Sequence, residues 1–339
     1  MSDNNNQPNH LNQQWRLVKR PQGLFQLSDF EFREEPLADL ADGQILVKIN
    51  YLSLDPTQRV WAQSDSYLPA VELGSVMRSL GMGEVIASQN PKFNPGDIVQ
   101  GMTGWQSHLI TDGKGFAKVP RLPGVPLAAF LGPLGMTGMT AYVGLLDIGK
   151  PKEGETVVVS GAAGAVGSMV CQIAKLKGCH VVGIAGSDEK CAWLKSLGVD
   201  GAINYKSENL YKSLKRNCPK GIDIYFENVG GKMLDAVLGQ INVGARIPLC
   251  GYISQYTNPD PSQGIQNLSV LISKRAKIEG FLVLDHMQRA TQIVTELATW
   301  AMSGKLKYQL DIVKGLKEAP IAVNKLFEGS NEGKLIIEV

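Results

Sequence analysis

A glycine-rich turn is the part of this sequence with the clearest chemical meaning. Residues 156–177 read TVVVSGAAGAVGSMVCQIAKLK, which is a β-branched run, the turn, and then apolar residues at helical spacing. Gly161, Gly164 and Gly167 allow the backbone to approach a ligand closely, and the N–H groups at the start of a helix attract an anion. The stretch therefore predicts a strand, a turn and a helix that bind a diphosphate.

The glycine spacing alone is a weak signal. In the dinucleotide fingerprint G-x-G-x-x-G, the position of the first glycine is occupied here by Ala162. The same glycines are compatible with an ordinary strand-to-helix turn in a packed α/β sheet. The elements that follow must decide between these two interpretations.

Strand-type and helix-type segments alternate after the turn, and the last is a long helix expected from Asp285 to Ser303. Six strands in such an alternation predict an α/β fold with a doubly wound parallel sheet, whose ligand lies at the carboxyl ends of the strands. The strands expected after the first are 180–186, 201–205, 222–230, 245–251 and 277–283. The residues that these ends bring together with the glycine turn are Ser187, Tyr205, Asn228, Cys250 and Phe281. This convergence favours a dinucleotide over a purely structural turn.

The first part of the chain has a different pattern. Residues 15 to about 130 alternate short β-type runs with Gly, Pro and Asp, which predicts a mostly antiparallel, barrel-like domain. The segment from Ala128 leads into a helix with Thr140 near its start, and the terminal KLIIEV is expected to return to the barrel as a strand. We expect a disordered polar tail over 1–14, a barrel and substrate domain over 15–133 and 305–339, and a nucleotide-binding domain over 134–304.

Length and composition limit the function classes. A chain of 339 residues favours two domains, and a net charge of +2 gives no electrostatic reason to expect nucleic acid or a membrane surface as partner. The uncharged run 156–174 is interrupted by the glycine turn, so we do not interpret it as a membrane span, and the polar N-terminus does not resemble a secretory signal. We therefore expect a small-molecule partner.

The cysteines and histidines argue against a metal site. Five cysteines at irregular spacing, without a C-x-x-C pair, indicate free thiols in a reducing cytoplasm. Zinc requires several converging ligands, but the first 150 residues contain no Cys and only two histidines, His10 and His108. We expect no metal, and His108 is expected to be a structural residue near a strand.

The end of the second expected strand indicates which dinucleotide binds. An NAD site places an acidic residue there, whereas this strand ends in Ala185-Gly186-Ser187. Asp188 and Glu189 follow one step later, where they serve the helix dipole equally well. Ser187 and Lys190 leave room and positive charge for a 2′-phosphate, which favours NADPH; the alternative is that Lys190 is an ordinary solvated helix residue.

Several longer motifs carry a family resemblance. LGMTGMTAY, GAAGAVGS, AGSDEK, ENVGG, LCGYISQY and a terminal N-x-G-K resemble the zinc-independent medium-chain dehydrogenase/reductases over essentially the whole chain after the tail. Within that family the sequence resembles the leukotriene B4 12-hydroxydehydrogenase/prostaglandin reductase branch, and most of all the bacterial NADPH-dependent curcumin/dihydrocurcumin reductases. One departure is Glu227, where relatives often carry Asp.

The resemblance implies a Rossmann-type doubly wound sheet, a GroES-like β-barrel and a homodimer. It also implies an enzyme that reduces the C=C bond of α,β-unsaturated ketones and aldehydes with NADPH and without a metal, by hydride transfer to the β-carbon and protonation of the enolate. The alternatives are an NADPH-dependent quinone oxidoreductase and a non-catalytic NADPH-binding protein.

The resemblance further implies a set of site residues. Tyr256 is expected to donate a hydrogen bond to the enolate oxygen, or alternatively only to position the cofactor. Tyr51, Tyr67 and Tyr252 are candidates for the substrate pocket, or else for packing. The residues implied to bind NADPH or NADP+ are Thr140, Gly164, Ala165, Val166, Gly167, Ser187, Lys190, Tyr205, Asn228, Cys250, Ser254, Tyr256, Phe281, Leu282, Val283 and Asn331.

Overall fold

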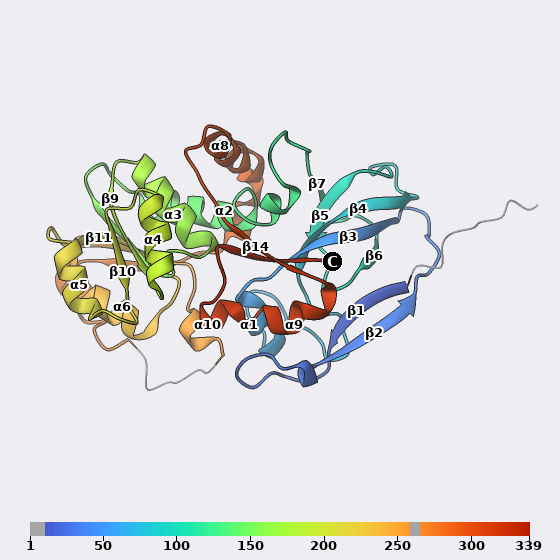
Figure 1. The fold of residues 1–339 in the computed structure, drawn as a ribbon, viewed down its shortest axis with the longest axis horizontal. Coiled ribbons are helices and arrows are strands. Elements are labelled where there is room, and N and C mark those ends of the chain that lie inside the picture. Colours follow the sequence, from blue (N-terminus) through green and yellow to red (C-terminus); the bar gives the residue numbers. More distant parts are fainter. Residues whose placement is uncertain (1–10, 258–264) are drawn as a thin grey trace, which may run out of the picture. The chain divides into compact units, whose positions relative to one another are not determined.

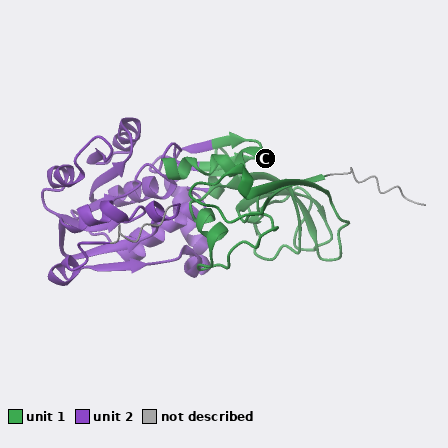
Figure 2. Ribbon diagram, turned by 90° about the horizontal axis from the view of Figure 1, so that it is seen from below, with its two compact units in different colours: residues 1–131, 312–328, 335–339 green, residues 132–311, 329–334 purple. Residues whose placement is uncertain are grey.

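A computed structural model describes residues 11–257 and 265–339 of the chain (Figure 1). The chain divides into two compact units (Figure 2). Unit 1 consists of Met1–Leu131, Ile312–Glu328 and Leu335–Val339, and unit 2 consists of Gly132–Asp311 and Gly329–Lys334. The sequence-based division did not assign the short segment Gly329–Lys334 to the nucleotide-binding part. None of the helices in the described ranges is long and apolar enough to cross a membrane.

Unit 2 contains a six-stranded parallel sheet. In spatial order its strands are β10 (Gly201–Asn204), β9 (His180–Ala185), β8 (Thr156–Val159), β11 (Ile222–Phe226), β12 (Ile241–Leu249) and β13 (Lys277–Gly280). The chain adds strands outward from β8 in one direction and then resumes on its other side with β11. This order is that of a doubly wound dinucleotide-binding sheet, so the predicted fold class is confirmed.

Helices cover this sheet. They are α2 (Met136–Tyr142), the π-helix η3 (Val143–Gly149), α3 (Ala165–Leu176), α4 (Asp188–Ser196), α5 (Leu210–Asn217), α6 (Gly231–Leu238), α7 (Val270–Lys274) and α8 (Ala290–Met302), with 3₁₀ turns η4 (Ile253–Gln255) and η6 (Val283–Arg289). Val158 of β8 packs into one core with the apolar residues of α5 and α6. Val157 and Val159 alternate to the opposite face and are also fully buried, which explains why this strand is apolar throughout.

Unit 1 is mostly antiparallel. Its strands are β1 (Leu11–Leu17), β2 (Phe30–Pro36), β3 (Ile45–Ser53), β4 (Leu80–Ser88), β5 (Ile98–Met102), β6 (His108–Thr111), β7 (Ala117–Lys118), β14 (Leu310–Lys314) and β15 (Lys334–Glu338). Its helices are α1 (Thr57–Gln63), α9 (Ala319–Ala322) and α10 (Lys325–Glu328), with 3₁₀ turns η1 (Leu27–Asp29), η2 (Leu127–Leu131) and η7 (Leu316–Glu318). β1 and β2 form a two-stranded sheet, and the other strands form a seven-stranded sheet in which β15 pairs with β3. The predicted return of the terminal strand to the N-terminal sheet is therefore confirmed.

The expected disordered tail over 1–14 is wrong for its last four residues. β1 begins at Leu11 and pairs antiparallel with β2. The polar side chains of this stretch have partners far along the chain, since Gln13 Nε2 donates to Glu34 Oε1 at 2.7 Å and Gln14 Nε2 donates to Glu35 Oε2 at 2.8 Å. Residues 1–10 lie outside the described part of the chain.

Two elements near the end of unit 2 are shorter than expected. The strand expected over 277–283 ends at Gly280, because its partner β12 ends at Leu249, which lies opposite Gly280. The helix expected from Asp285 begins as the tighter turn η6, in which Asp285 N donates to Leu282 O at 3.1 Å, and becomes α-helical only at Ala290. Phe281 and Leu282 are consequently in irregular backbone.

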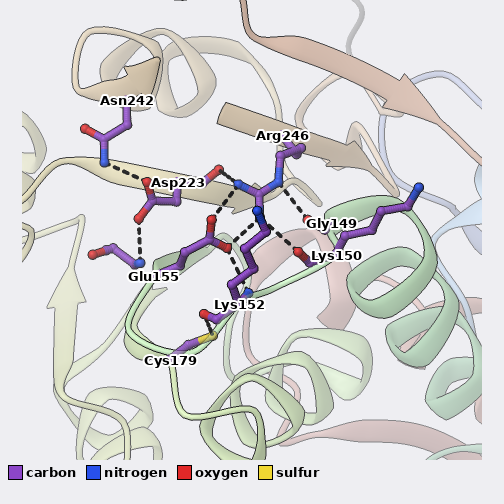
Figure 3. A network of polar contacts seen from close by, with 9 residues as sticks. Gly149, Lys150, Lys152, Glu155, Cys179, Asp223, Asn242 and Arg246 are labelled. Carbon is purple, nitrogen blue, oxygen red and sulfur yellow. Dashed lines mark hydrogen bonds and ion pairs between the residues drawn. The ribbon is translucent and has the colours of Figure 1, made fainter. Parts of the chain in front are cut away.

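A polar network joins the amino ends of the central strands (Figure 3). Arg246 of β12 forms a two-point ion pair with Glu155, with Nη1–Oε1 at 3.0 Å and Nη2–Oε2 at 2.6 Å. The same guanidinium donates to the carbonyl oxygens of Gly149 and Lys150 at 2.9 and 3.0 Å, which ends the π-helix beside the sheet. Asp223 of β11 accepts from the backbone N–H of residue 156 at 2.8 Å. Both side chains of the ion pair are about four-fifths buried, which favours a stabilising role.

We expect Arg246→Met to lower the free energy of unfolding by about 2 kcal/mol, because it leaves Glu155 and two carbonyl groups without their donor. Thermal unfolding followed by circular dichroism measures this change. The matched control is Arg216→Met, whose side chain is 70% exposed in its pair with Glu208 and should contribute less than about 0.5 kcal/mol. Equal shifts for the two variants would contradict the assignment.

Candidate functional site

The carboxyl ends of the parallel strands form one edge of unit 2. β8 lies at the centre of the sheet, between β9 and β11, and the chain grows outward from it in both directions. The connections on either side of β8 therefore run over opposite faces, which opens a crevice beyond the end of this strand. The glycine turn 161–167 follows β8 directly into this position.

The turn presents the start of α3 without a side-chain cap. Gly164 precedes the helix in extended conformation, with φ −76° and ψ 176°, and its first turn receives no side-chain hydrogen bond. The N–H groups of Ala165, Val166 and Gly167 have no acceptor within the helix and point to its amino end. These three are residues expected to bind the diphosphate, and their geometry fits an anion.

The missing first glycine of the fingerprint is compensated in the neighbouring strand. Ala162 N donates to Ile184 O of β9 at 3.0 Å, so the turn lies directly against that strand. A Cβ on Gly183 would stand 2.9 Å from the Ala162 methyl group. The turn therefore has room for alanine at this position because the residue opposite it in β9 is glycine. Gly167 remains necessary, because a Cβ there would clash with Gly161 O.

Ser187 and Asp188 follow shortly after β9, and both are bound within unit 2. Ser187 caps α4, and its Oγ accepts from Lys190 N at 3.3 Å. Asp188 Oδ1 accepts from Asn204 Nδ2 of β10 at 2.8 Å, so this carboxylate binds the sheet. The side chain of Ser187 also helps to lower the pKa of Glu189, after the hydrogen bond from that residue's own backbone. This arrangement is consistent with a site for a 2′-phosphate.

Lys190 links α4 to the segment 329–334. Its Nζ donates to Gly329 O at 2.7 Å. In the same segment Gly333 forms a β-bridge with Gly164 of the glycine turn, and buried Asn331 donates from Nδ2 to Gly333 O at 2.9 Å. The structure therefore brings Asn331 and Lys190 to the edge that carries the turn, although they are 141 positions apart in the sequence.

Tyr205 follows β10 and lies beside the end of β9. Its backbone N–H donates to Ala185 O at 3.1 Å, and its ring lies against Gly186. The side chain is 43% exposed, so one face is available to a ligand. This position is compatible with a contact between Tyr205 and a cofactor on the side of the crevice where Ser187 lies.

Asn228 follows β11 and is fastened to the end of β8. Its backbone N–H donates to Ser160 Oγ at 2.8 Å, and its Nδ2 donates to Ser160 O at 2.7 Å. Glu227, fully buried next to it, accepts from Ser160 Oγ at 2.6 Å. Asn228 is thus held at the crevice by groups that directly precede the glycine turn.

The loop after β12 folds over the turn that follows β11. Ser254 N donates to Val229 O at 3.1 Å, and the Tyr252 ring fills the space where a Cβ of Gly230 would lie. Tyr256 Oη accepts from Tyr252 N at 3.1 Å. Cys250, Tyr252, Ser254 and Tyr256 therefore form one group with Asn228, and much of the Tyr252 ring serves packing.

Phe281, Leu282 and Val283 follow β13 at the same edge. The Phe281 ring meets Phe226 in a T-shaped contact, with centroids 6.3 Å apart, and it lies against Gly144 of the π-helix. Thr140 is the fifth residue of α2, rather than at its start, and its Oγ1 donates to Met136 O at 2.8 Å. Its hydroxyl proton is consequently used within the helix.

Tyr51 and Tyr67 belong to unit 1. Tyr51 is a half-buried residue of β3. Tyr67 is 43% exposed, its hydroxyl lies 2.9 Å from Thr57 Oγ1, and its ring contacts Trp61 edge-on with centroids 6.1 Å apart. The segment 51–80 contains the short helix α1.

All five cysteines lie among the described residues and are free thiols, as predicted. Burial raises the pKa of Cys171, Cys218 and Cys250 to about 12 and that of Cys179 to about 11. For Cys250 the charge of Glu227 adds to this effect. At neutral pH these side chains are thiols.

His108 lies in β6, with Nδ1 3.0 Å from Ser107 Oγ, consistent with a structural role. Within residues 11–257 and 265–339, no group of three or more His, Cys, Asp or Glu side chains is arranged to hold a metal ion.

Three contributors to this edge were not predicted as site residues: Ser160, Glu227 and Gly183. Ser160 and Glu227 each follow an apolar strand directly and precede a glycine-containing turn. A polar residue at that position of a buried strand is a usable signal. Gly183 gave no such signal, because its role depends on Ala162, which lies in the glycine turn.

The comparisons with known proteins agree with this geometry. Family models described as "N-terminal domain of oxidoreductase" and "Zinc-binding dehydrogenase" match residues 13–119 and 165–300. The NADPH-dependent curcumin reductase of Escherichia coli is 42% identical over 98% of this chain and 98% of its own. The NADP(+)-dependent 2-alkenal reductase of Nicotiana tabacum is 47% identical over 87% of each chain.

A solved structure gives the same result. CurA from Vibrio vulnificus in complex with NADPH superposes with a TM-score of 0.92 at 42% identity, covering 96% of this chain and 99% of that one. Sequence, fold and site geometry thus lead to one assignment: the chain belongs to the zinc-independent branch of the medium-chain dehydrogenase/reductases that includes the curcumin, prostaglandin and 2-alkenal reductases.

Proposed function

We propose that this protein reduces the C=C bond of α,β-unsaturated ketones and aldehydes, including curcumin-type enones, with NADPH. The observation that carries the proposal is the uncapped start of α3 at the centre of a crevice whose rim bears Ser187, Lys190 and Asn228. Relatives that are 42–47% identical over most of the chain are named as NADP(H)-dependent reductases of curcumin and 2-alkenals.

The residues fit NADPH better than NADH. Asp188, the first acidic residue after β9, binds Asn204 and is not placed as a ribose acceptor. Lys190 brings a positive charge to the end of β9, where it bonds a neutral carbonyl group that a phosphate would outcompete. The N–H groups of residues 165–167 would hold the diphosphate, and Asn228 and Asn331 would bind the remainder.

The bound cofactor supplies a hydride to the β-carbon of the substrate. Negative charge then develops on the carbonyl oxygen, and a hydrogen-bond donor at that oxygen stabilises the enolate before its α-carbon is protonated. The protein has to orient the substrate, exclude water and provide this donor.

Tyr256 is proposed as the donor. Its oxygen accepts a hydrogen bond from Tyr252 N at 3.1 Å, an arrangement that fixes the position of the phenol. An N–H bond to the phenol oxygen also favours negative charge there, so it strengthens donation to an enolate. Tyr51, Tyr67 and Tyr252 are proposed to contact the substrate.

We also propose a homodimer that works in the cytoplasm. β13 is the outer strand of the parallel sheet as far as the sheet is described, and Leu282, Leu284 and Met287 beside it are exposed, which supports association of two copies at this edge. The free thiols support a reducing compartment. Sedimentation equilibrium should give twice the chain mass of 36.7 kDa; the chain mass itself would contradict the dimer.

The decisive experiment is a panel of enones, enals and quinones assayed with NADPH and with NADH by the absorbance at 340 nm. We expect turnover with enones and enals, with the saturated ketone or aldehyde as product, and a preference for NADPH. Oxidation with quinones alone would favour a quinone oxidoreductase. Tight NADPH binding without any turnover would favour a binding protein.

Lys190→Ala should raise the KM for NADPH about tenfold and leave that for NADH almost unchanged, because only the 2′-phosphate contact is lost. The control is Lys195→Ala, an exposed lysine near the end of the same helix. Steady-state kinetics with both cofactors measure the difference. An equal loss for NADPH and NADH would contradict the role of Lys190.

Tyr256→Phe should lower kcat about 10- to 100-fold and change the Kd for NADPH far less, since the hydroxyl acts on charge that develops during the reaction. Tyr211→Phe, a change at a tyrosine of α5 that is 51% exposed, is the control and should behave as the wild type. An unchanged kcat would reduce Tyr256 to a scaffold residue.

A further inference from the structure

Glu227 is a buried carboxyl group in an unusual setting. It lies directly after β11 with 0% exposure, and its Oε1 accepts two short hydrogen bonds, from Ser160 Oγ and from Val229 N, both at 2.6 Å. Within the described ranges, no lysine or arginine forms an ion pair with it. The hydrogen bonds of this carboxyl group must therefore offset the free-energy cost of removing it from water.

Those hydrogen bonds connect two turns that lead into the crevice. Ser160, the last residue before the glycine turn, donates to Glu227 and accepts from Asn228 N at 2.8 Å. Ser160 O accepts from Asn228 Nδ2 at 2.7 Å. Glu227 O accepts from Cys250 N at 2.9 Å, so the loop after β12 is attached to the same point. The carboxyl group of Glu227 thus joins the residue after β8 to the turn after β11, and the backbone carbonyl of the same residue holds the loop after β12.

The surroundings of Glu227 contain titratable groups but no counterion. Burial raises the pKa of Glu227, while the Ser160 hydroxyl and the backbone N–H groups of Val229 and Gly230 oppose that rise. Burial and the Glu227 charge raise the pKa of Tyr225, which is fully buried on the same strand. The same two effects raise the pKa of Cys250. A residue selected for stability alone would not require an acid here, since an apolar side chain avoids these costs.

We propose that Glu227 is a positioning residue, which holds the glycine turn and the Asn228–Gly231 turn at the separation that binds the cofactor diphosphate and ribose. The inference rests on the proposed NADPH site and adds a residue that does not itself touch the ligand. It acts through Ser160 and Val229, and its essential feature is the acceptor oxygen rather than its charge. A small displacement of either turn would misalign the N–H groups that bind the cofactor.

A second carboxylate offers a matched control. Asp223 joins the same two strands at their amino ends, where its Oδ2 accepts from the backbone N–H of residue 156 at 2.8 Å. Asp223→Ala should destabilise the sheet without moving the crevice. Glu227→Ala should destabilise it and also disturb the cofactor site. The comparison separates positioning from general stability.

The experiment measures the Kd for NADPH by nucleotide fluorescence, together with the thermal unfolding midpoint, for the full chain well below that midpoint. We expect Glu227→Ala to raise the Kd about tenfold or more, Ser160→Ala to raise it severalfold, and Glu227→Gln to stay within about threefold of wild type because the amide retains an acceptor oxygen. Asp223→Ala should leave the Kd unchanged while lowering the midpoint.

The inference is wrong if Glu227→Ala and Ser160→Ala bind NADPH as the wild type does, or if Asp223→Ala weakens binding as much as they do. It is also wrong if Glu227→Gln binds as weakly as Glu227→Ala, because the oxygen acceptor is then not the essential feature. If Glu227→Ala does not fold, Ser160→Ala decides the matter. Failure of the wild-type protein to bind NADPH would instead overturn the proposed function.

Discussion

The close approach of the glycine turn to its own sheet is the constraint on which unit 2 depends. The turn must lie flat against β9 for α3 to start at the central crevice, and no side chain fits between them. Two arrangements of small residues satisfy this requirement: glycine in the turn, or alanine in the turn with glycine opposite. This chain uses the second for Ala162 and Gly183, while Gly167 meets a separate constraint, because a Cβ there would clash with Gly161 O inside the turn. The fingerprint is therefore better understood as a limit on total volume at the contact than as a fixed series of glycines.

The polar groups of the sheet are divided between its two ends. At the amino ends, Arg246 neutralises Glu155 and binds two carbonyl groups, which closes this end of the sheet electrostatically. At the carboxyl ends, the described residues offer Glu227 hydrogen bonds in place of a counterion. The carboxyl end thus carries the N–H groups at the start of α3 and the positive charge of Lys190. The same strands thus have an ion pair at their amino ends and groups that attract an anion at their carboxyl ends.

Much of this fold follows from sequence patterns because its determinants are local. The apolar strands, their alternation with helices and the isolated terminal strand predicted both the parallel sheet and the pairing of β15 with β3. β1 was missed at its start because its polar side chains are stabilised by residues of β2 that the local pattern does not include. The early end of β13 depends on where its partner β12 ends, and α8 starts late because the tighter turn η6 precedes it.

The candidate site also contains residues that local sequence patterns predicted and residues whose position depends on distant parts of the chain. Ser187, Lys190, Tyr205 and Asn228 were predictable, since each follows a recognisable strand and the strand ends must meet. The attachment of Asn331 to the glycine turn was not derivable from spacing, because it depends on a short return of the chain into unit 2. The buried pairing of Ser160 with Glu227 was also missed, since burial at the end of a strand depends on loops that cover it.

The raised pKa values of the cysteines have a consequence for an enzyme of conjugated carbonyl compounds. Such substrates react with thiolates at the β-carbon, the same atom that accepts hydride in the proposed reaction, so they are potential alkylating agents of the protein that converts them. Burial and the Glu227 charge raise the pKa of Cys250 to about 12, so its side chain is a thiol at neutral pH. The position of this sulfur next to Glu227 therefore disfavours the thiolate that would react with such a compound.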